Sequence, residues 1–431
     1  MKRSVDRRDF IRLGAGAGLV TGLTGIALAQ NKPAKPLRLG VVGVGGRGTY
    51  LLRLALAAGV EAPALCDIRE PNLARAIEVV AQARDGRKPE GYSRGPEDYQ
   101  RMVARDDLDA VLIGTGMQIH APIAVAAMRA GKHVLSEVAA AMTLDDCWKL
   151  VDTAEQTGKI YMLAENCCYW EHLLAVEQMV RQGLFGDLTY AECGYVHDCR
   201  SLMLEPDGSL TWRGEMVRDS AGDNYPTHNL GPVSRWLGIH RGDRFVSMVS
   251  RATGQKSWLD FLAKKLPAEH ATRRFQYKGS DSVSTLVRTA KGVLIDVRYD
   301  IVSPRPAWGP YHALQGTKGS FESRTGNQVW LEERSKGTKW QPVADYAAEF
   351  EPAKWKEFRA QAQSSGHGGA DFFVIHEFLE AIRRGGPSPV DVYDAVAWSS
   401  IIALSAKSIA EGGKEQEVPD FTRGKWQKAS S

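Results

Sequence analysis

A tyrosine and a histidine three positions apart, Tyr225 and His228, have the chemistry to move a proton. A phenol beside an imidazole can take a proton from a substrate hydroxyl while a hydride leaves the same carbon. Residues three apart on a helix share a face, so these two side chains can meet. Asp223 or Asn224 is predicted to cap this helix, with Pro226 in its first turn. The alternative is a histidine that only satisfies a buried tyrosine.

A glycine-rich loop predicts the hydride acceptor that such chemistry needs. Gly43, Gly45 and Gly48 stand in G-x-G-x-x-G spacing between an apolar, β-branched run and a leucine- and alanine-rich one. In a dinucleotide site the first glycine permits a tight turn, and the second lets the backbone approach a pyrophosphate. The third lets helix and strand pack closely. Asp67 would bind the adenosine ribose and favours NAD, whereas Arg69 keeps NADP as the alternative.

The elements that position these residues alternate between strand-like and helix-like patterns as far as Ala164, which is typical of a doubly wound parallel sheet. Beyond Asn166, β content and turn residues predict a more open, largely antiparallel sheet followed by helices. The fold class is therefore an α/β Rossmann domain followed by an α+β domain. The predicted parts are an export signal at 1–29, a linker at 30–36, an NAD-binding domain at 37–166, and a substrate domain at 167–424 whose C-terminal helices pack back.

Individual elements follow from hydrophobic periodicity and end signals. In the first domain the predicted strands lie at 37–42, 60–66, 108–114, 132–135 and 159–164, and the helices at 50–58, 121–130 and 143–157, the last with Thr143 as its N-cap. In the second domain the predicted strands lie at 188–196, 245–252, 282–289 and 293–300, and the helices at 173–182, 372–383 and 392–409.

The N-terminus resembles a twin-arginine export signal. Arg7 and Arg8 precede a Gly/Ala/Leu-rich segment that closes on Ala27-Leu28-Ala29, as a cleavage site does. We therefore expect an exported protein, for example a periplasmic one, with no membrane span once the signal is cleaved. Because free NAD is not expected outside the cytoplasm, the cofactor would be tightly bound and regenerated on site.

Composition limits the other classes of function. The 431 residues are 43% hydrophobic and 25% charged, which is ordinary for a globular protein of two domains. Removing 1–29 lowers the formal charge from +4 to +1, so nothing basic remains to bind nucleic acid. The six cysteines form no C-x-x-C, so we expect no metal site and read most of them as small buried hydrophobes: Cys66, Cys147, Cys167, Cys168, Cys193 and Cys199.

The chain resembles glycoside hydrolase family 109 over nearly the whole length that follows the signal. These are NAD-dependent glycosidases, described as α-N-acetylgalactosaminidases, within the glucose–fructose oxidoreductase/inositol dehydrogenase superfamily. The strings that carry the resemblance are Asn166-Cys167-Cys168-Tyr169, Tyr195-Val196-His197-Asp198, Tyr225-Pro226-Thr227-His228, Arg241-Gly242-Asp243-Arg244-Phe245, Gln315-Gly316-Thr317-Lys318-Gly319, Gly366-His367-Gly368-Gly369 and Pro419-Asp420-Phe421-Thr422-Arg423-Gly424.

The resemblance implies a set of binding residues by position. Those for the cofactor are Gly46, Arg47, Asp67, Met117, Gln118, His120, Glu137, Val138 and Asn166. Those for the sugar are Tyr195, Arg213, Tyr225, Pro226, Thr227 and His228.

Three departures from the family pattern predict a remodelled pocket rim. Met117 stands where the family has tryptophan, and Asn229 replaces a glycine. After Arg305-Pro306 the chain has Ala307-Trp308 instead of a tyrosine, so Tyr311 is the nearest tyrosine and the predicted substrate contact.

The resemblance also implies a reaction on a small glycoside or glycan terminus. NAD⁺ would oxidise the C3 hydroxyl, which acidifies the C2 proton; elimination at C1, water addition and re-reduction would follow. Neither paired carboxylates nor a metal motif is evident, which is compatible with this route. Tyr225 and His228 are the candidates for C3 and Tyr169 for C2, with an aromatic packed beside Trp170 as the alternative for Tyr169.

Two other functions are left open by the residues. One is an exported sugar oxidoreductase with bound NAD(P), which stops at the ketone. Val138 counts against it, because plain dehydrogenases of the superfamily carry a proton-handling lysine there. The other is a non-catalytic sugar-binding protein, which the glycine loop and the Tyr225/His228 pair disfavour. Assembly with further copies of the chain is also left open.

Overall fold

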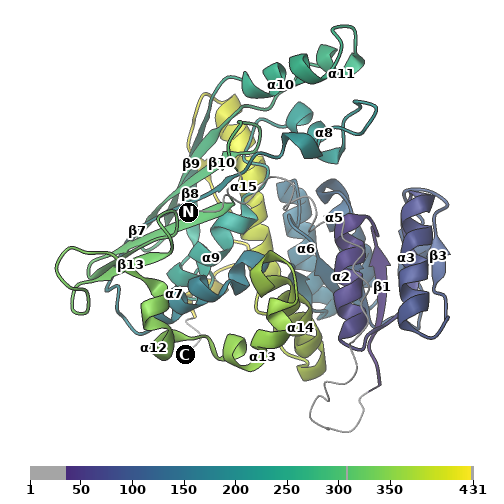
Figure 1. Ribbon diagram of the computed structural model, residues 1–431, viewed down its shortest axis with the longest axis horizontal. Helices are drawn as coiled ribbons and strands as arrows, with labels where there is room; N and C mark the ends of the chain where they lie inside the picture. The colour runs from purple at the N-terminus through teal and green to yellow at the C-terminus, as the bar shows by residue number, and fades with distance from the viewer. Residues whose placement is uncertain (1–34, 307–308, 429–431) are drawn as a thin grey trace, which may run out of the picture. The chain divides into compact units, whose positions relative to one another are not determined.

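The computed structural model describes residues 35–306 and 309–428 (Figure 1). The predicted export signal at 1–29, most of the linker at 30–36 and the pair Ala307-Trp308 lie outside the described residues. All the described helices and strands belong to the unit that begins at Leu37.

The first sheet is the predicted parallel sheet. Its six strands run in the order β3-β2-β1-β4-β5-β6, and every neighbouring pair is parallel. The strands are β1 Arg38–Val42, β2 Glu61–Cys66, β3 Glu90–Tyr92, β4 Ala110–Ile113, β5 His133–Ser136 and β6 Tyr161–Leu163. The helices are α2 Gly46–Ala57, α3 Glu70–Ala83, α4 Tyr99–Val103, α5 His120–Arg129 and α6 Leu144–Thr157. The inner strands are short and largely apolar, such as Ala-Val-Leu-Ile of β4, all four residues of which are buried, as expected for a sheet covered on both faces.

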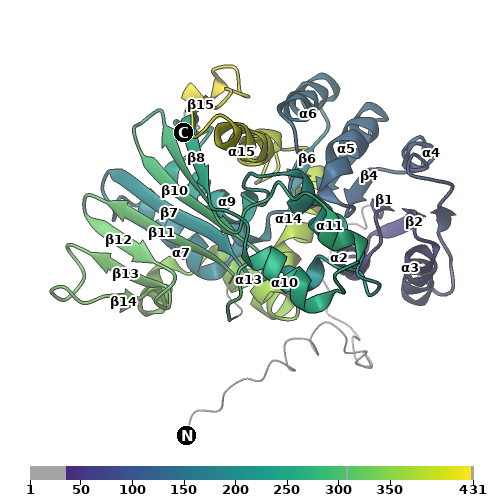
Figure 2. The ribbon, with the colours of Figure 1, turned by 90° about the horizontal axis from the view of Figure 1, so that it is seen from above.

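The second sheet is mixed and largely antiparallel, as predicted. Its nine strands run in the order β14-β13-β12-β11-β7-β10-β9-β8-β15, in which only β7 and β10 are a parallel pair among the described strands. Figure 2 shows this sheet with β14 at one edge and β15 at the other. The strands are β7 Leu188–Val196, β8 Phe245–Ala252, β9 Val283–Thr289, β10 Leu294–Asp300, β11 Pro310–Gly316, β12 Gly319–Glu322, β13 Gln328–Leu331, β14 Gln341–Pro342 and β15 Gln416–Glu417. Buried and exposed residues alternate strictly along β9, so one face of this sheet is covered and the other is open.

The helices of the second domain pack on this sheet, extend beyond it or return to the first domain. They are α7 Glu171–Arg181, α8 Trp212–Asp219, α9 Thr227–Leu237, α10 Ser257–Lys265, α11 Ala271–Arg274, α12 Ala347–Phe350, α13 Ala353–Gln363, α14 Ala370–Arg384 and α15 Val392–Ala410. Helix α9 packs on β7 and β11, while α15 lies between β8 and α6 (Figure 1). Helix α14 contacts α2, and one apolar core runs through both domains.

The structure confirms the predicted cap of α6 and corrects the predicted starts of α2 and α9. Thr143 caps α6 by accepting the backbone N–H of Asp146 at 3.1 Å. Helix α2 begins at Gly46, before the predicted 50–58, because the glycine loop itself forms the first turn. The predicted cap at Asp223 or Asn224 is wrong: α9 begins at Thr227 with Pro226 as its N-cap residue. The Asp223 carboxylate instead accepts the N–H of Tyr225 at 3.0 Å, in a turn before the helix.

All six cysteines are free and buried, as small hydrophobes are. Among the residues that the structure describes, no helix is long and apolar enough to span a bilayer.

Candidate active site

The glycine loop joins β1 to α2 and is tightly packed at two of its glycines. Gly43 has a φ of +82°, which side chains rarely adopt. A Cβ on Gly48 would lie 1.8 Å from the carbonyl oxygen of Gly43. At Gly45 and Gly46 the situation is different. A Cβ on Gly45 would meet only Asn72, at 3.9 Å, and one on Gly46 would meet no described atom within 4 Å. The space over these two glycines is therefore available to a ligand.

Asp67 follows β2 and holds the glycine loop from the side. Its carboxylate accepts the backbone N–H of Val44 at 2.9 Å and that of Arg69 at 2.8 Å. The Arg69 guanidinium turns away and pairs with Glu205 of the second domain at 2.9 Å. Asp67 therefore has the place that the sequence predicts for a ribose ligand.

Asp67→Ala is expected to weaken NAD binding by about 1.5–3 kcal/mol, roughly ten- to 150-fold, because a charged acceptor is lost. The purified variant should release less NAD on acid denaturation than the wild type, and excess NAD should restore its activity. Asp106→Ala, which removes an exposed carboxylate of the same domain, is the control. Unchanged NAD content would mean that Asp67 is not the ribose ligand.

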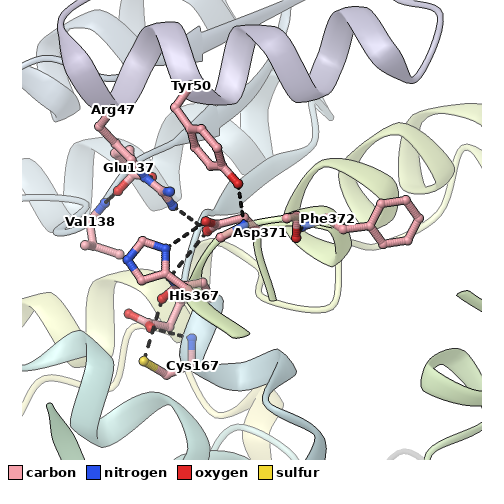
Figure 3. A network of polar contacts seen from close by, with 12 residues as sticks. Arg47, Tyr50, Glu137, Val138, Cys167, His367, Asp371 and Phe372 are labelled. Atoms are coloured by element: carbon pink, nitrogen blue, oxygen red, sulfur yellow. Dashed lines mark hydrogen bonds and ion pairs between the residues drawn. The ribbon is translucent and has the colours of Figure 1, made fainter. Parts of the chain in front are cut away.

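Arg47, in the first turn of α2, lies at the centre of a polar network (Figure 3). Its Nε donates to Glu137 at 2.7 Å and one Nη donates to Asp371 at 2.8 Å. Its other terminal nitrogen is buried and finds no hydrogen-bond acceptor among the described residues. An orphaned guanidinium nitrogen at a helix N-terminus, beside two uncovered glycines, fits an anionic dinucleotide. The residues present therefore fit NAD.

The loop that follows β4 lies at the carboxyl end of the sheet and contacts the second domain. Met117 is buried in an apolar cluster with residues of the second domain, such as Met203 and Val217. Gln118 donates to the carbonyl of Trp212 at 3.4 Å.

His120 supports this loop from inside the protein. Its ring nitrogens lie 2.8 Å from the carbonyl of Ala139 and 3.1 Å from that of Thr115. Burial lowers the pKa of His120, so the ring is neutral and donates to one carbonyl at a time. The structure thus gives His120 a role in shaping the loop.

An aromatic cluster in the second domain gathers several predicted substrate residues. It consists of Tyr195 and His197 at the end of β7, Tyr225 just before α9 and His228 in the first turn of α9. Tyr195 stacks on Tyr225 with centroids 4.9 Å apart. The ring of His228 lies 5.1 Å from that of Tyr225, so the predicted meeting of these two side chains is confirmed. Burial raises the pKa of Tyr225 to about 12, which keeps it a neutral phenol.

His228 is held by a buried acid that the sequence did not reveal. Its Nδ1 lies 2.7 Å from Oε1 of Glu165, a side chain with no exposed surface. Burial raises the pKa of Glu165, but the charge and hydrogen bond of His228 outweigh burial and lower it overall. When the ring is neutral, the carboxylate holds its one proton on Nδ1, and the lone pair of Nε2 is then open to a substrate.

Other predicted sugar contacts border the aromatic cluster. Arg213 on α8 lies close enough to lower the pKa of Tyr225 against the effect of burial, and it stacks over Trp212 at 4.2 Å. Within the described chain no carboxylate pairs with Arg213, so its charge is available to a ligand. Pro226 and Thr227 form the start of α9, and the buried Thr227 side chain contributes to the lowered pKa of Glu165.

Two predicted residues lie apart from the aromatic cluster. Tyr169 is buried at the domain junction, where its ring stacks on Phe373 with centroids 6.2 Å apart. This placement matches the packing alternative. Tyr311 pairs with Gly194 across β11 and β7, whereas Tyr195 pairs with Pro310. Because neighbouring residues of a strand point to opposite faces, Tyr311 lies on the opposite face of the sheet from Tyr195, and its role as a substrate contact stays a prediction.

Three possible metal ligands, one of which is His228, lie close together, although the sequence predicted no metal site. Ligand atoms of Glu165, Cys167 and His228 lie within 4.8 Å of one another, a donor set that zinc accepts. The 2.7 Å contact between Glu165 and His228 is a hydrogen bond that a metal would have to break. Burial also raises the pKa of Cys167 well above its usual value, whereas zinc needs a thiolate. We therefore interpret the three as an acid–base pair beside a neutral thiol.

Comparison with known families divides the chain where its two domains meet. Residues 37–165 match the oxidoreductase family with an NAD-binding Rossmann fold, and residues 169–428 match the C-terminal domain of glycosyl hydrolase 109.

Similar proteins cover nearly the whole chain. An alpha-N-acetylgalactosaminidase of Bacteroides fragilis is 38% identical over 92% of this chain and 94% of its own length. One of Tannerella forsythia is 34% identical over 97% of both. A glycosyl hydrolase family 109 protein of Solibacter usitatus is 36% identical over 98% of both. Among solved structures, levoglucosan dehydrogenase in complex with NADH shares the fold at 20% identity, with a TM-score of 0.68 over 89% of this chain and all of that one.

Proposed function

Because the chain belongs to glycosyl hydrolase family 109 and is a glycoside hydrolase, we propose that it cleaves its substrate through transient oxidation at C3 with a resident NAD. The proposed substrate class is the α-N-acetylgalactosaminide, which the names of two relatives carry. NAD, when bound, supplies an acceptor that takes the C3 hydride and returns it at the end of the cycle.

The single observation that carries this proposal is the buried Glu165–His228 pair, which faces the stacked tyrosines. With its Nδ1 proton held by Glu165, His228 accepts the C3 hydroxyl proton at Nε2 while the hydride leaves. Tyr225 donates a hydrogen bond to the same hydroxyl, and Arg213 binds another polar group of the sugar. These roles need no lysine at Val138.

The remaining steps follow from the ketone. A C3 ketone acidifies the C2 hydrogen, so a base removes that proton and the C1 substituent departs by elimination. Water then adds at C1 and a proton returns to C2, which gives the hydrolysed sugar after the hydride returns to C3. This route does not need the two carboxylates of ordinary glycosidases.

Export by the twin-arginine route is a second part of the proposal. It is supported by Arg7, Arg8 and the Ala27-Leu28-Ala29 segment. An exported enzyme of this kind must carry NAD with it, which requires tight binding and a cycle that regenerates the cofactor.

The protein without residues 1–29 is expected to hydrolyse 4-nitrophenyl N-acetyl-α-galactosaminide with no added NAD. Acid denaturation of the same sample should release NAD into the supernatant. Activity from a nucleotide-free protein would overturn the proposed mechanism. Release of a ketone, with a second sugar as oxidant and no nitrophenol, would instead identify a sugar oxidoreductase.

A further inference from the structure

Arg69 lies beside the predicted ribose ligand and leaves the choice between NAD and NADP open. Its backbone N–H donates to the Asp67 carboxylate at 2.8 Å, so the two residues are held together beyond the end of β2. In Rossmann sites an acid at this place binds the ribose 2′-hydroxyl of NAD, whereas a nearby arginine accommodates the 2′-phosphate of NADP. Side chains of both kinds are present here. The nucleotide that the site selects therefore depends on what the Arg69 guanidinium binds.

The Arg69 guanidinium binds Glu205, a residue of the second domain. One Nη atom of Arg69 donates to Oε1 of Glu205 at 2.9 Å, although 136 positions separate the two residues in the chain. The two side chains are 65% and 30% exposed. Because an exposed ion pair contributes little to stability, this contact matters less for the fold than for the charge beside Asp67. It takes up the cation that a 2′-phosphate would need.

Glu205 is held in place by the backbone of a tight turn. Its N–H donates to the Ser209 carbonyl at 2.9 Å, and its carbonyl accepts the Gly208 N–H at 2.9 Å. The Asp207 carboxylate accepts the Ser209 N–H at 2.9 Å, and the Thr272 hydroxyl of α11 donates to the Gly208 carbonyl at 2.8 Å. The Glu205 side chain therefore reaches the first domain from a turn whose backbone is hydrogen-bonded internally and to a helix.

A second cation near the glycine loop, Arg75 on α3, has neutral partners. Its guanidinium donates to the Asn72 side chain at 3.0 Å and to the Val44 carbonyl at 3.5 Å. These contacts do not include Glu205. A change of charge at Glu205 therefore acts directly on Arg69 and leaves the contacts of Arg75 as they are.

We propose that Glu205 is a specificity-determining residue through which the site selects NAD over NADP, an inference that rests on the proposed use of NAD. A 2′-phosphate would have to displace Glu205 from Arg69, and it would also meet the negative charge of Asp67, which repels it. The 2′-hydroxyl of NAD carries no charge, so it can bind Asp67 while the ion pair stays intact. The choice of cofactor thus depends on a residue of the second domain as well as on the acid that follows β2.

The test is competition between the two nucleotides in Glu205→Gln, because glutamine keeps the size of the side chain and removes its charge. The full protein with its bound NAD is incubated with NADP in increasing excess until the bound ratio no longer changes. Gel filtration removes free nucleotide, and chromatography quantifies the NAD and NADP that acid releases. We expect displacement at an NADP:NAD ratio about five- to tenfold lower than in the wild type, the equivalent of one exposed charge pair. Adding Arg69→Gln should abolish this difference, because the cation that binds the phosphate is then gone.

Asp207→Asn is the matched control. It removes one negative charge from the same turn, at a residue whose described hydrogen bonds go to Ser209 and not to Arg69. Its displacement ratio should equal that of the wild type, and the thermal midpoint should be unchanged in both single variants. A Glu205→Gln variant with the wild-type ratio, or an equal change in Asp207→Asn, would overturn the role of Glu205 alone. A wild type that retains neither nucleotide would overturn the proposed function and this inference with it.

Discussion

Replacing His228 with alanine is expected to slow glycoside hydrolysis by about 10²–10⁴-fold, the usual contribution of one positioned acid–base group. The substitution removes the proposed acceptor of the C3 hydroxyl proton and leaves the buried Glu165 carboxylate without its 2.7 Å partner. Hydrolysis is measured with excess NAD, so that loss of cofactor does not contribute. His376→Ala, at a histidine stacked on Phe372, is the control and should keep the wild-type rate.

Deuterium labelling shows whether His228 acts before the C2 step. In D₂O the wild type should place deuterium at C2 of the released sugar, while C3 keeps the hydrogen it lent to the cofactor. In His228→Ala this exchange should fall with hydrolysis, because oxidation precedes removal of the C2 proton. In hydrolysis by two carboxylates, the C2 hydrogen takes no part in the reaction, so no deuterium enters at C2.

An active enzyme that releases sugar without deuterium at C2 would argue against the oxidation route. A base shielded from solvent could return the same proton, so a C2-deuterated substrate is the complementary probe. If this substrate is also cleaved at the undeuterated rate, the C2–H bond does not break in a slow step.

Features that depend on neighbouring residues could be predicted from the sequence. The strands at 188–196 and 245–252 have the predicted bounds. The β-forming residues that predict each strand lie within it, and the turn residues that end it come directly before and after. The glycine loop and Asp67 were also predictable, since the turn, the helix start and the next strand end are one continuous unit. The cap of α9 was not, because Asp223 binds the Tyr225 N–H in a separate turn.

Residues that act across long sequence separations were missed. Glu165 lies 63 positions from His228, and Asp371 lies 324 from Arg47. Neither acid belongs to a sequence motif that indicates which residue it binds. These two contacts follow only from the way α9 and α14 pack on the first domain. The face of the sheet on which Tyr311 lies could not be predicted either. Its face depends on the register of β11 with β7, and a shift of one residue reverses it.

Two glycine substitutions in one loop are expected to have opposite effects. In Gly48→Ala the new Cβ would lie 1.8 Å from the backbone oxygen of Gly43, which no rotamer change relieves. We expect a loss of at least about 3 kcal/mol in the free energy of unfolding, at the upper end of overpacking costs. In Gly45→Ala the nearest described atom is 3.9 Å from the Cβ, so the nucleotide-free protein should stay within about 0.5 kcal/mol of the wild type.

NAD binding should distinguish the two variants further. A methyl group at Gly45 would occupy the space that we assign to the pyrophosphate, at a cost of about 1–3 kcal/mol, or roughly five- to 150-fold in NAD affinity. Denaturant unfolding of nucleotide-free protein measures the first effect, and titration with NAD measures the second. Gly59→Ala is not a suitable control because Gly59 has a φ of +85°, whereas Gly254→Ala meets no described atom within 4 Å at an ordinary φ. If Gly45→Ala binds NAD as tightly as Gly254→Ala does, the pyrophosphate does not lie over this loop, and the cofactor site must be assigned elsewhere.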